Sequence, residues 1–280
     1  MRKVMKALLP KVLGNYINAL AVISPQAAAA LAFHIFSKPR QGAVGPHHQE
    51  FLDGARVEVF GLDELKIQVY HWPASGPTVL LVHGWESHSH RWKMLIEKLQ
   101  TANFNIFSID APAHGYSSGT NFYVPLYEQV VNLMVDKYTV DYIVGHSVGG
   151  MTALYHQYKN PSQTVKKLVI LGSPDRLEDI MTGFQSVLGL SGRAMTSLNN
   201  YFKDRFGFRI EEFNGAAFAK GLQVPGLVIH DKDDKITPFK GSVAIAKAWG
   251  KAEFMSTNGL GHSLYSEEVN NRILQFLSEK

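Results

Sequence analysis

The chain has 280 residues, of which 45% are hydrophobic and 11% aromatic, enough for one large domain, or one domain with an insertion, around a sizeable core. It contains no cysteine, which excludes disulfides, thiolate metal sites and a cysteine nucleophile. The net charge of +4 is mild, and no arginine stripe or aromatic platform is present, so no nucleic-acid partner is expected.

The N-terminal segment, residues 1–50, holds two apolar stretches. The first begins like a signal peptide, with basic residues before an apolar run, but Pro10 interrupts it. Ser24 followed by Pro25 is typical of a helix start and predicts a helix over Gln26 to Phe36. Neither stretch reaches the roughly 20 apolar residues that span a bilayer. We expect a helical extension that packs on the domain or rests weakly on a membrane surface. A cleaved signal peptide is the alternative.

After residue 50, short apolar runs alternate with amphipathic helical stretches. Arg56 to Phe60 and Glu64 to Trp72 predict an antiparallel hairpin. The other strand runs are Thr78–Val82, Asp141–Val144, Leu168–Leu171, Val224–His230 and Lys251–Ser256, and the helical patterns are Arg91–Thr101, Tyr127–Tyr138, Leu177–Leu188, Ala194–Phe206 and Glu267–Leu277. This alternation predicts an α/β protein with a mostly parallel, twisted sheet and helices on both faces.

The most specific motif is Gly145-His146-Ser147-Val148-Gly149, between a predicted strand and a predicted helix. G-x-S-x-G alone occurs by chance in many proteins, but a strand, this turn and a helix together form a nucleophile elbow. The glycines remove Cβ atoms that would collide across the tight turn, and the helix points N–H groups at a developing oxyanion. The pattern predicts Ser147 as the nucleophile of a serine hydrolase.

A serine hydroxyl needs a base, and the base needs an orienting carboxylate. In this architecture the acid and then the histidine follow the serine. Asp231, Asp233 and Asp234 compete for the acid position after the strand that ends at His230, and at least one of them is expected to be a solvated turn residue. His262, in a glycine-rich loop after the last predicted strand, is the predicted base.

The expected oxyanion donors are the N–H groups of Val148, directly after the nucleophile, and of Trp85, in the loop after an earlier strand. Gly84 lets that loop approach the site, and we interpret His83 as a structural residue that bridges loops. The pair His88-Ser89-His90 resembles a metal-binding H-x-H motif, but no further ligand cluster follows nearby. Neither a metal nor another cofactor is therefore expected.

Five segments together resemble the α/β-hydrolase fold superfamily, over roughly residues 50 to 280. They are His83-Gly84-Trp85, Asp110 to Ser117, Gly145 to Gly150, His230 to Pro238, and Gly261-His262. Within the second, Pro112-Ala113 stands where a glycine is common in the family. The family's acid stands four residues before a proline, which selects Asp234 ahead of Pro238. The resemblance implies a triad of Ser147, Asp234 and His262, and a serine elbow argues against the haloalkane dehalogenase and epoxide hydrolase branches.

Residues 175–222 are too long for a simple connection between a helix and a strand. In this superfamily such an insertion is a helical cap, with the core over residues 51–174 and 223–280. Met181, Phe184 and Leu188 are candidate substrate-binding residues, and the alternative is that they pack against the cap's own helices.

The expected function is hydrolysis of small-molecule carboxylic esters with apolar, short- to medium-chain acyl groups, through an acyl-enzyme. A thioesterase, a lactonase or a carbon–carbon bond hydrolase would use the same triad. A non-catalytic binding protein of this fold is the alternative from another class. The absence of cysteine fits a reducing compartment, so a cytoplasmic location is expected.

Overall fold

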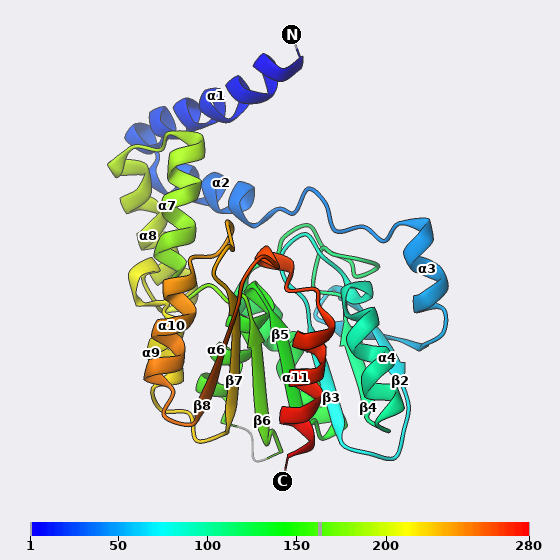
Figure 1. Ribbon diagram of the computed structural model, residues 1–280. Helices are drawn as coiled ribbons and strands as arrows, with labels where there is room; N and C mark the ends of the chain where they lie inside the picture. Colours follow the sequence, from blue (N-terminus) through cyan, green and yellow to red (C-terminus); the bar gives the residue numbers. More distant parts are fainter. Residues whose placement is uncertain (1, 162–163, 280) are drawn as a thin grey trace. The chain divides into compact units, whose positions relative to one another are not determined.

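The computed structural model describes residues 2–161 and 164–279, with the backbone alone for residues 2–8. Their contacts divide the chain into two compact units (Figure 1). The helical unit contains the residues up to Lys38 together with Arg176–Asn214, and the core unit contains Pro39–Asp175 and Gly215–Lys280.

The core unit is built on an eight-stranded sheet in the order β1-β2-β4-β3-β5-β6-β7-β8. β1 (Arg56–Leu62) and β2 (Leu65–Trp72) form the predicted antiparallel hairpin, and β2 also pairs antiparallel with β4 (Asn105–Ile109). All the remaining neighbouring strands pair in parallel. In β3, for example, Leu80 lies opposite Phe107 of β4 and Ile143 of β5. The remaining strands are β3 (Thr78–Val82), β5 (Tyr142–His146), β6 (Lys167–Leu171), β7 (Gly226–Asp231) and β8 (Ala252–Thr257). The predicted mostly parallel sheet is confirmed.

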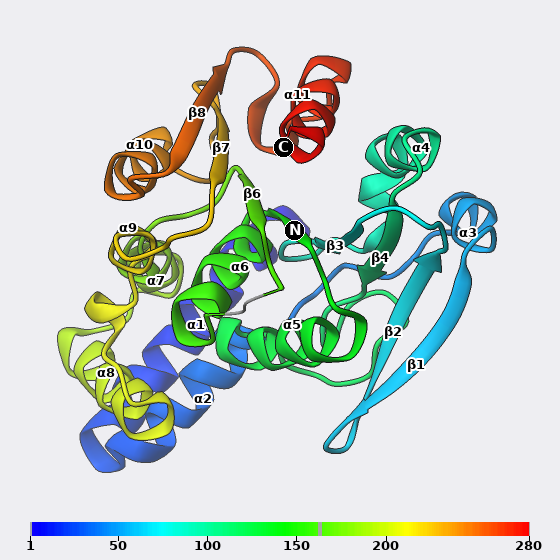
Figure 2. The same cartoon turned by 90° about the horizontal axis from the view of Figure 1, so that it is seen from below.

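Helices cover both faces of this sheet, as Figure 2 shows. One face carries α3 (Pro46–Leu52), the 3-10 turn η1 (Ser89–Trp92), α4 (Lys93–Thr101) and α11 (Glu267–Ser278). The other face carries α5 (Val124–Tyr138), α6 (Val148–Lys159), α9 (Gly215–Ala219) and α10 (Phe239–Ala248). α9 falls within the segment expected to form the insertion, but it packs with α6 and α10 in the core unit.

Side chains of each inner strand alternate between two hydrophobic cores. In β3, Leu80 and Val82 join the core beneath α5 and α6, whereas Val79 and Leu81 join the core beneath α4 and α11. Because both faces are covered, the strand is apolar along its whole length rather than alternately polar. Each such fully buried side chain contributes about 1.5–3 kcal/mol to folding.

The helical unit consists of α1 (Arg2–Ile23), α2 (Pro25–Ser37), α7 (Leu177–Leu188), α8 (Gly192–Phe206) and the short turn η2 (Ile210–Glu212). α1 packs against α2, α7 and α8, with Ile17 and Ala21 fully buried. Pro10, which interrupts the apolar run of the sequence, lies inside α1. A proline inside a helix removes one backbone hydrogen bond. Among the described residues, no helix is long and apolar enough to cross a bilayer.

The contact between β3 and α6 gives a first prediction. A Cβ atom at Gly149 would lie 2.2 Å from the carbonyl oxygen of Val82 and 2.5 Å from that of His83. Gly149→Ala should therefore lower the free energy of unfolding by about 1–3 kcal/mol, measured by urea denaturation. Gly183→Ala in α7 is the control, because a Cβ there meets no atom within 4 Å and alanine favours the helix by up to about 1 kcal/mol. Equal stability of the two variants would contradict the close packing at Gly149.

Candidate active site

The turn between β5 and α6 consists of Ser147 alone. β5 ends at His146 and α6 begins at Val148. The φ of 55° and ψ of −126° at Ser147 lie in a region that residues with a Cβ rarely adopt. The N–H of Ser147 donates to the carbonyl of Leu171 at 2.8 Å, which fixes this backbone against β6. Local strain of this kind therefore supports the interpretation of the motif as a nucleophile elbow.

The side chains of Ser147, His262 and Asp234 form a continuous chain of hydrogen bonds. Ser147 Oγ donates to His262 Nε2 at 3.0 Å, and His262 Nδ1–H donates to Asp234 Oδ2 at 2.7 Å. Asp234 follows β7, and His262 lies in the 3-10 turn η3 (Gly261–Ser263) after β8. Because β5, β7 and β8 are parallel, the loops that follow them meet at one edge of the sheet. The structure thus brings together the three predicted triad residues.

The Asp234 carboxylate is completely buried and fixed by donors from its own loop. Its Oδ1 accepts from the N–H groups of Ile236 at 2.7 Å and Thr237 at 3.0 Å, and its Oδ2 accepts from Thr237 Oγ1 at 2.7 Å. Burial alone would raise the pKa of Asp234, but the hydrogen bonds from Thr237 and His262 outweigh it and hold the pKa below its usual value. Asp234 is therefore ionised near neutral pH and held in one orientation. Sequence reasoning missed Thr237, although a threonine three residues after an aspartate is a common turn signal.

The other two aspartates have different partners. Asp231 Oδ2 accepts from Thr257 Oγ1 at 2.7 Å and from the N–H of Leu260 at 3.0 Å, so it anchors the loop that carries His262. Asp233 Oδ2 accepts from the N–H of Gly259 at 3.0 Å on the exposed side of the same loop. Neither carboxylate has a hydrogen bond to the imidazole of His262 in the described part of the chain.

Two further side chains donate hydrogen bonds to the loop that carries His262. His146 Nε2–H donates to the carbonyl of His262 at 2.8 Å, and Arg91 Nη2 donates to the carbonyl of Ser263 at 3.2 Å. Burial, with the nearby Arg91 charge, lowers the pKa of His146 well below its ordinary value, so His146 is neutral. His146, the residue before the serine in the G-x-S-x-G motif, therefore connects the elbow to the loop that carries His262. The motif alone did not predict this role.

The two predicted oxyanion residues flank Ser147. Val148 is the first residue of α6, a position whose N–H has no partner within a helix. Trp85 follows Gly84, where a Cβ atom would lie 2.8 Å from Ser147 Cβ, so this loop passes directly beside the serine. The Trp85 ring packs on Phe122, 5.6 Å between centroids. Donation from these two N–H groups to a substrate oxygen stays a prediction.

Buried polar residues connect the loops around this site. Asp110 accepts hydrogen bonds from the N–H and Oγ of Ser89, at 2.9 and 2.8 Å, and from the N–H of Tyr116 at 3.0 Å. His83 Nε2 accepts from the N–H of Ala111 at 2.9 Å. Burial raises the pKa of Asp110 and lowers that of His83. Both residues therefore bridge loops.

The three candidate substrate-binding residues lie in α7 of the helical unit. Met181 and Leu188 are buried, and the ring of Phe184 packs against Phe36 of α2 with 5.3 Å between centroids. Phe184 thus packs within its own unit, and contact of any of the three with a substrate stays a prediction.

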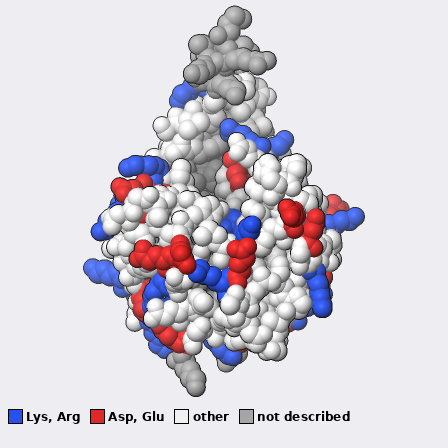
Figure 3. All heavy atoms as spheres, turned by 45° about the vertical axis from the view of Figure 1, so that its right-hand side comes forward, with Lys and Arg blue, Asp and Glu red and all other residues white. Residues whose placement is uncertain are grey.

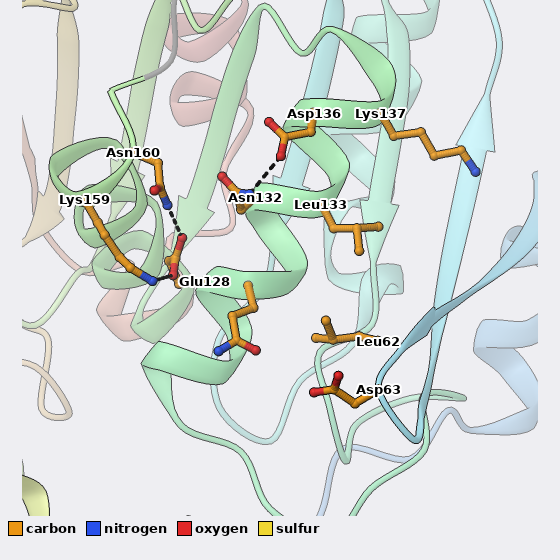
Figure 4. A pocket seen from close by; sticks show the side chains of 10 residues that line it. Leu62, Asp63, Glu128, Asn132, Leu133, Asp136, Lys137, Lys159 and Asn160 are labelled. Carbon is orange, nitrogen blue, oxygen red and sulfur yellow. Dashed lines mark hydrogen bonds and ion pairs between the residues drawn. The ribbon is translucent and has the colours of Figure 1, made fainter. Parts of the chain in front are cut away.

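A polar hollow of about 640 Å³ lies between α5, the end of α6 and the β1–β2 turn (Figure 4). None of the triad residues lines it. Its most buried carboxylate, Glu128, accepts from Lys159 Nζ at 2.7 Å and Asn160 Nδ2 at 2.6 Å, so this side chain has its partners within the protein. Within residues 2–161 and 164–279, no group of three or more His, Asp or Glu side chains is arranged to hold a metal ion.

This chain is similar in sequence to known proteins. A family model described as alpha/beta hydrolase fold matches residues 77–190. A curated relative, pimeloyl-[acyl-carrier protein] methyl ester esterase of Vibrio parahaemolyticus, is 23% identical over 145 residues, which are 51% of this chain and 54% of the relative. The chain thus spans about half the length of the curated relatives it matches.

Solved structures of other proteins superpose on most of this chain. Est1E from Butyrivibrio proteoclasticus, with ferulic acid bound, superposes with a TM-score of 0.65 at 19% identity, covering 79% of this chain and 97% of that one. The esterase EaEST from Exiguobacterium antarcticum superposes with a TM-score of 0.63 at 14% identity, covering 80% and 100%. At these identities the likeness shows that this chain has the α/β-hydrolase fold, which the family model also matches over residues 77–190.

Proposed function

We propose that this protein hydrolyses carboxylic esters through a covalent acyl-enzyme. The observation that carries the proposal is the hydrogen-bond chain from Ser147 Oγ to His262, 3.0 Å, and from His262 to Asp234, 2.7 Å. The strained elbow supports it, because such a backbone conformation persists mainly at functional sites. The curated relative and the structural neighbour EaEST are both named as esterases, which favours an ester as the substrate class.

In the proposed reaction, Ser147 Oγ attacks the ester carbonyl carbon while His262 Nε2 takes the serine proton. The N–H groups of Val148 and Trp85 stabilise the negative charge on the carbonyl oxygen, and Asp234 stabilises the imidazolium of His262. His262 then gives the proton to the departing alcohol. Water attacks the acyl-enzyme with His262 again as base, which releases the acid and restores Ser147. Every proton transfer passes through His262, so no step calls for a cofactor.

We further propose that the acyl group is apolar and of short to medium length. The support is the apolar side chains Met181, Phe184 and Leu188, which are spaced along one side of α7. Methionine is flexible and polarizable, which suits varied apolar shapes. The same triad would also cleave thioesters, lactones or activated carbon–carbon bonds, so a substrate panel has to include these classes.

The nucleophile is tested by Ser147→Ala. Because this change removes only Oγ, the variant should keep its circular dichroism spectrum and lose covalent labelling by a fluorophosphonate probe. Slow residual hydrolysis is compatible with the mechanism, since oxyanion stabilisation survives the loss of a triad member. Ser197→Ala, at a half-buried serine of α8 outside the triad, is the control and should label like the wild type. Labelling of Ser147→Ala at the wild-type rate would refute the assignment.

The acid is tested by comparing the three aspartates. Asp234→Asn should lower kcat/KM by about a thousandfold or more, because His262 loses the charge that orients it and stabilises its imidazolium. Asp233→Asn should have a much smaller effect, since its carboxylate contacts only the exposed side of the loop. Asp231→Asn should mainly lower stability, which urea denaturation separates from turnover. A larger loss of turnover at Asp231 than at Asp234 would reassign the acid.

Substrate preference is tested with p-nitrophenyl esters from acetyl to palmitoyl. Each methylene that is well buried is worth about 0.8 kcal/mol, so kcat/KM should rise by up to about fourfold per methylene and then fall beyond medium chain length. Phe184→Ala should move the maximum, whereas Val187→Ala, at an exposed residue of the same helix, should leave it in place. A flat profile would mean that the α7 side chains only pack internally, and a maximum at palmitoyl would indicate a lipase.

A further inference from the structure

Helix α1 presents a stripe of large apolar side chains to solvent. Leu9, Val12, Tyr16 and Ile23 are 69%, 62%, 60% and 82% exposed. At 3.6 residues per turn these four positions fall within an arc of about 60° on the helix. We call them the α1 stripe. Single exposed apolar residues are common on soluble proteins, but an aligned row on one helix needs a reason.

The opposite face of α1 fixes the helix to the rest of the helical unit. Ile17 and Ala21 are fully buried, and a Cβ atom at Gly14 would lie 1.9 Å from the carbonyl oxygen of Leu188. Asn18 Nδ2 donates to the carbonyl of Gly189 at 2.9 Å, and Asn18 Oδ1 accepts from the N–H of Ser191 at 2.7 Å. The helix is therefore held against α7 and the α7–α8 turn (Figure 1). The four side chains of the α1 stripe remain exposed to solvent.

The charge distribution of the chain is strongly uneven. The chain carries 28 Lys and Arg against 24 Asp and Glu, and residues 1–49 hold six of the basic residues and none of the acidic ones. Residues 50–280 are consequently net negative by two. On the core unit, the face in Figure 3 shows acidic and basic side chains interspersed, without a broad patch of one sign. The segment that carries the α1 stripe is therefore the basic part of the molecule.

We propose that α1 docks this protein onto an anionic lipid surface, with the α1 stripe in the boundary between headgroups and acyl chains. A helix with an apolar row in a basic segment is the type that lies in the plane of such an interface, and tyrosine favours that depth. The basic residues add attraction to anionic headgroups, at distances within the Debye length. A second copy of this chain fits less well, because it would bring two basic helices together, and four side chains are few beside the roughly 800 Å² per partner of a stable interface.

The test is flotation of the full chain with vesicles of phosphatidylcholine, with and without phosphatidylglycerol. The wild type should bind the anionic vesicles, bind phosphatidylcholine alone much more weakly, and detach as NaCl is raised. The double variant Val12→Gln/Tyr16→Gln should lower the partition coefficient on anionic vesicles by about tenfold or more, because it removes half of the apolar row. Both positions are exposed, so the fold should be kept, and circular dichroism checks this.

A matched control makes the same two changes on the core unit. Val57→Gln/Tyr158→Gln alters residues of similar exposure, 52% and 55%, and should bind like the wild type. Failure of the wild type to bind anionic vesicles, or an equal loss in both double variants, would overturn the proposal. A lipid-free dimer that Val12→Gln/Tyr16→Gln converts to monomer in light scattering would instead assign the α1 stripe to self-association. Vesicle binding requires no turnover, so its outcome is independent of the proposed ester hydrolysis.

Discussion

Close backbone packing around Ser147 sets the geometry on which the rest of the site depends. A φ of 55° at a residue with a Cβ is unfavourable by roughly 1–3 kcal/mol and persists only where the surroundings hold it. Here glycine at 149 admits the carbonyls of Val82 and His83, and glycine at 84 admits the serine itself. The strand, the helix and the oxyanion loop thus touch through backbone atoms. That contact directs Ser147 Oγ toward the one loop that carries a base.

Burial then determines which groups near the serine carry charge. Burial lowers the pKa of His83, His146 and His230, so these imidazoles are neutral and form structural hydrogen bonds. Asp234 is equally enclosed, but the donors around it keep its carboxylate ionised. The oriented Asp234 carboxylate therefore faces His262 Nδ1, where it can stabilise an imidazolium. Because these imidazoles are neutral, several histidines can lie close together near the serine without electrostatic repulsion.

The proposed chemistry and the proposed lipid contact use separate parts of the chain. The triad lies in loops of the core unit, whereas the α1 stripe lies in the helical unit. Weak interfacial binding through one helix would be reversible, because a short apolar row buries little surface. A protein of this kind would meet apolar esters where they concentrate, at a lipid surface.

The sequence by itself determined most strands of the sheet, the elbow and the order of the chemical groups, because these depend on local patterns. It did not predict β4. Unbroken apolar runs and a G-x-S-x-G turn can be recognised from a few consecutive residues. It left three aspartates open, and only the resemblance to a family chose among them. The tertiary structure gives Asp234 to His262 and gives Asp231 and Asp233 to the loop backbone. It alone also decided that His146 supports the His262 loop, that α1 continues through Pro10, and that α9 belongs to the core unit. Each of these depends on contacts between residues far apart in the chain, such as the 115 positions between Ser147 and His262, which no local pattern encodes.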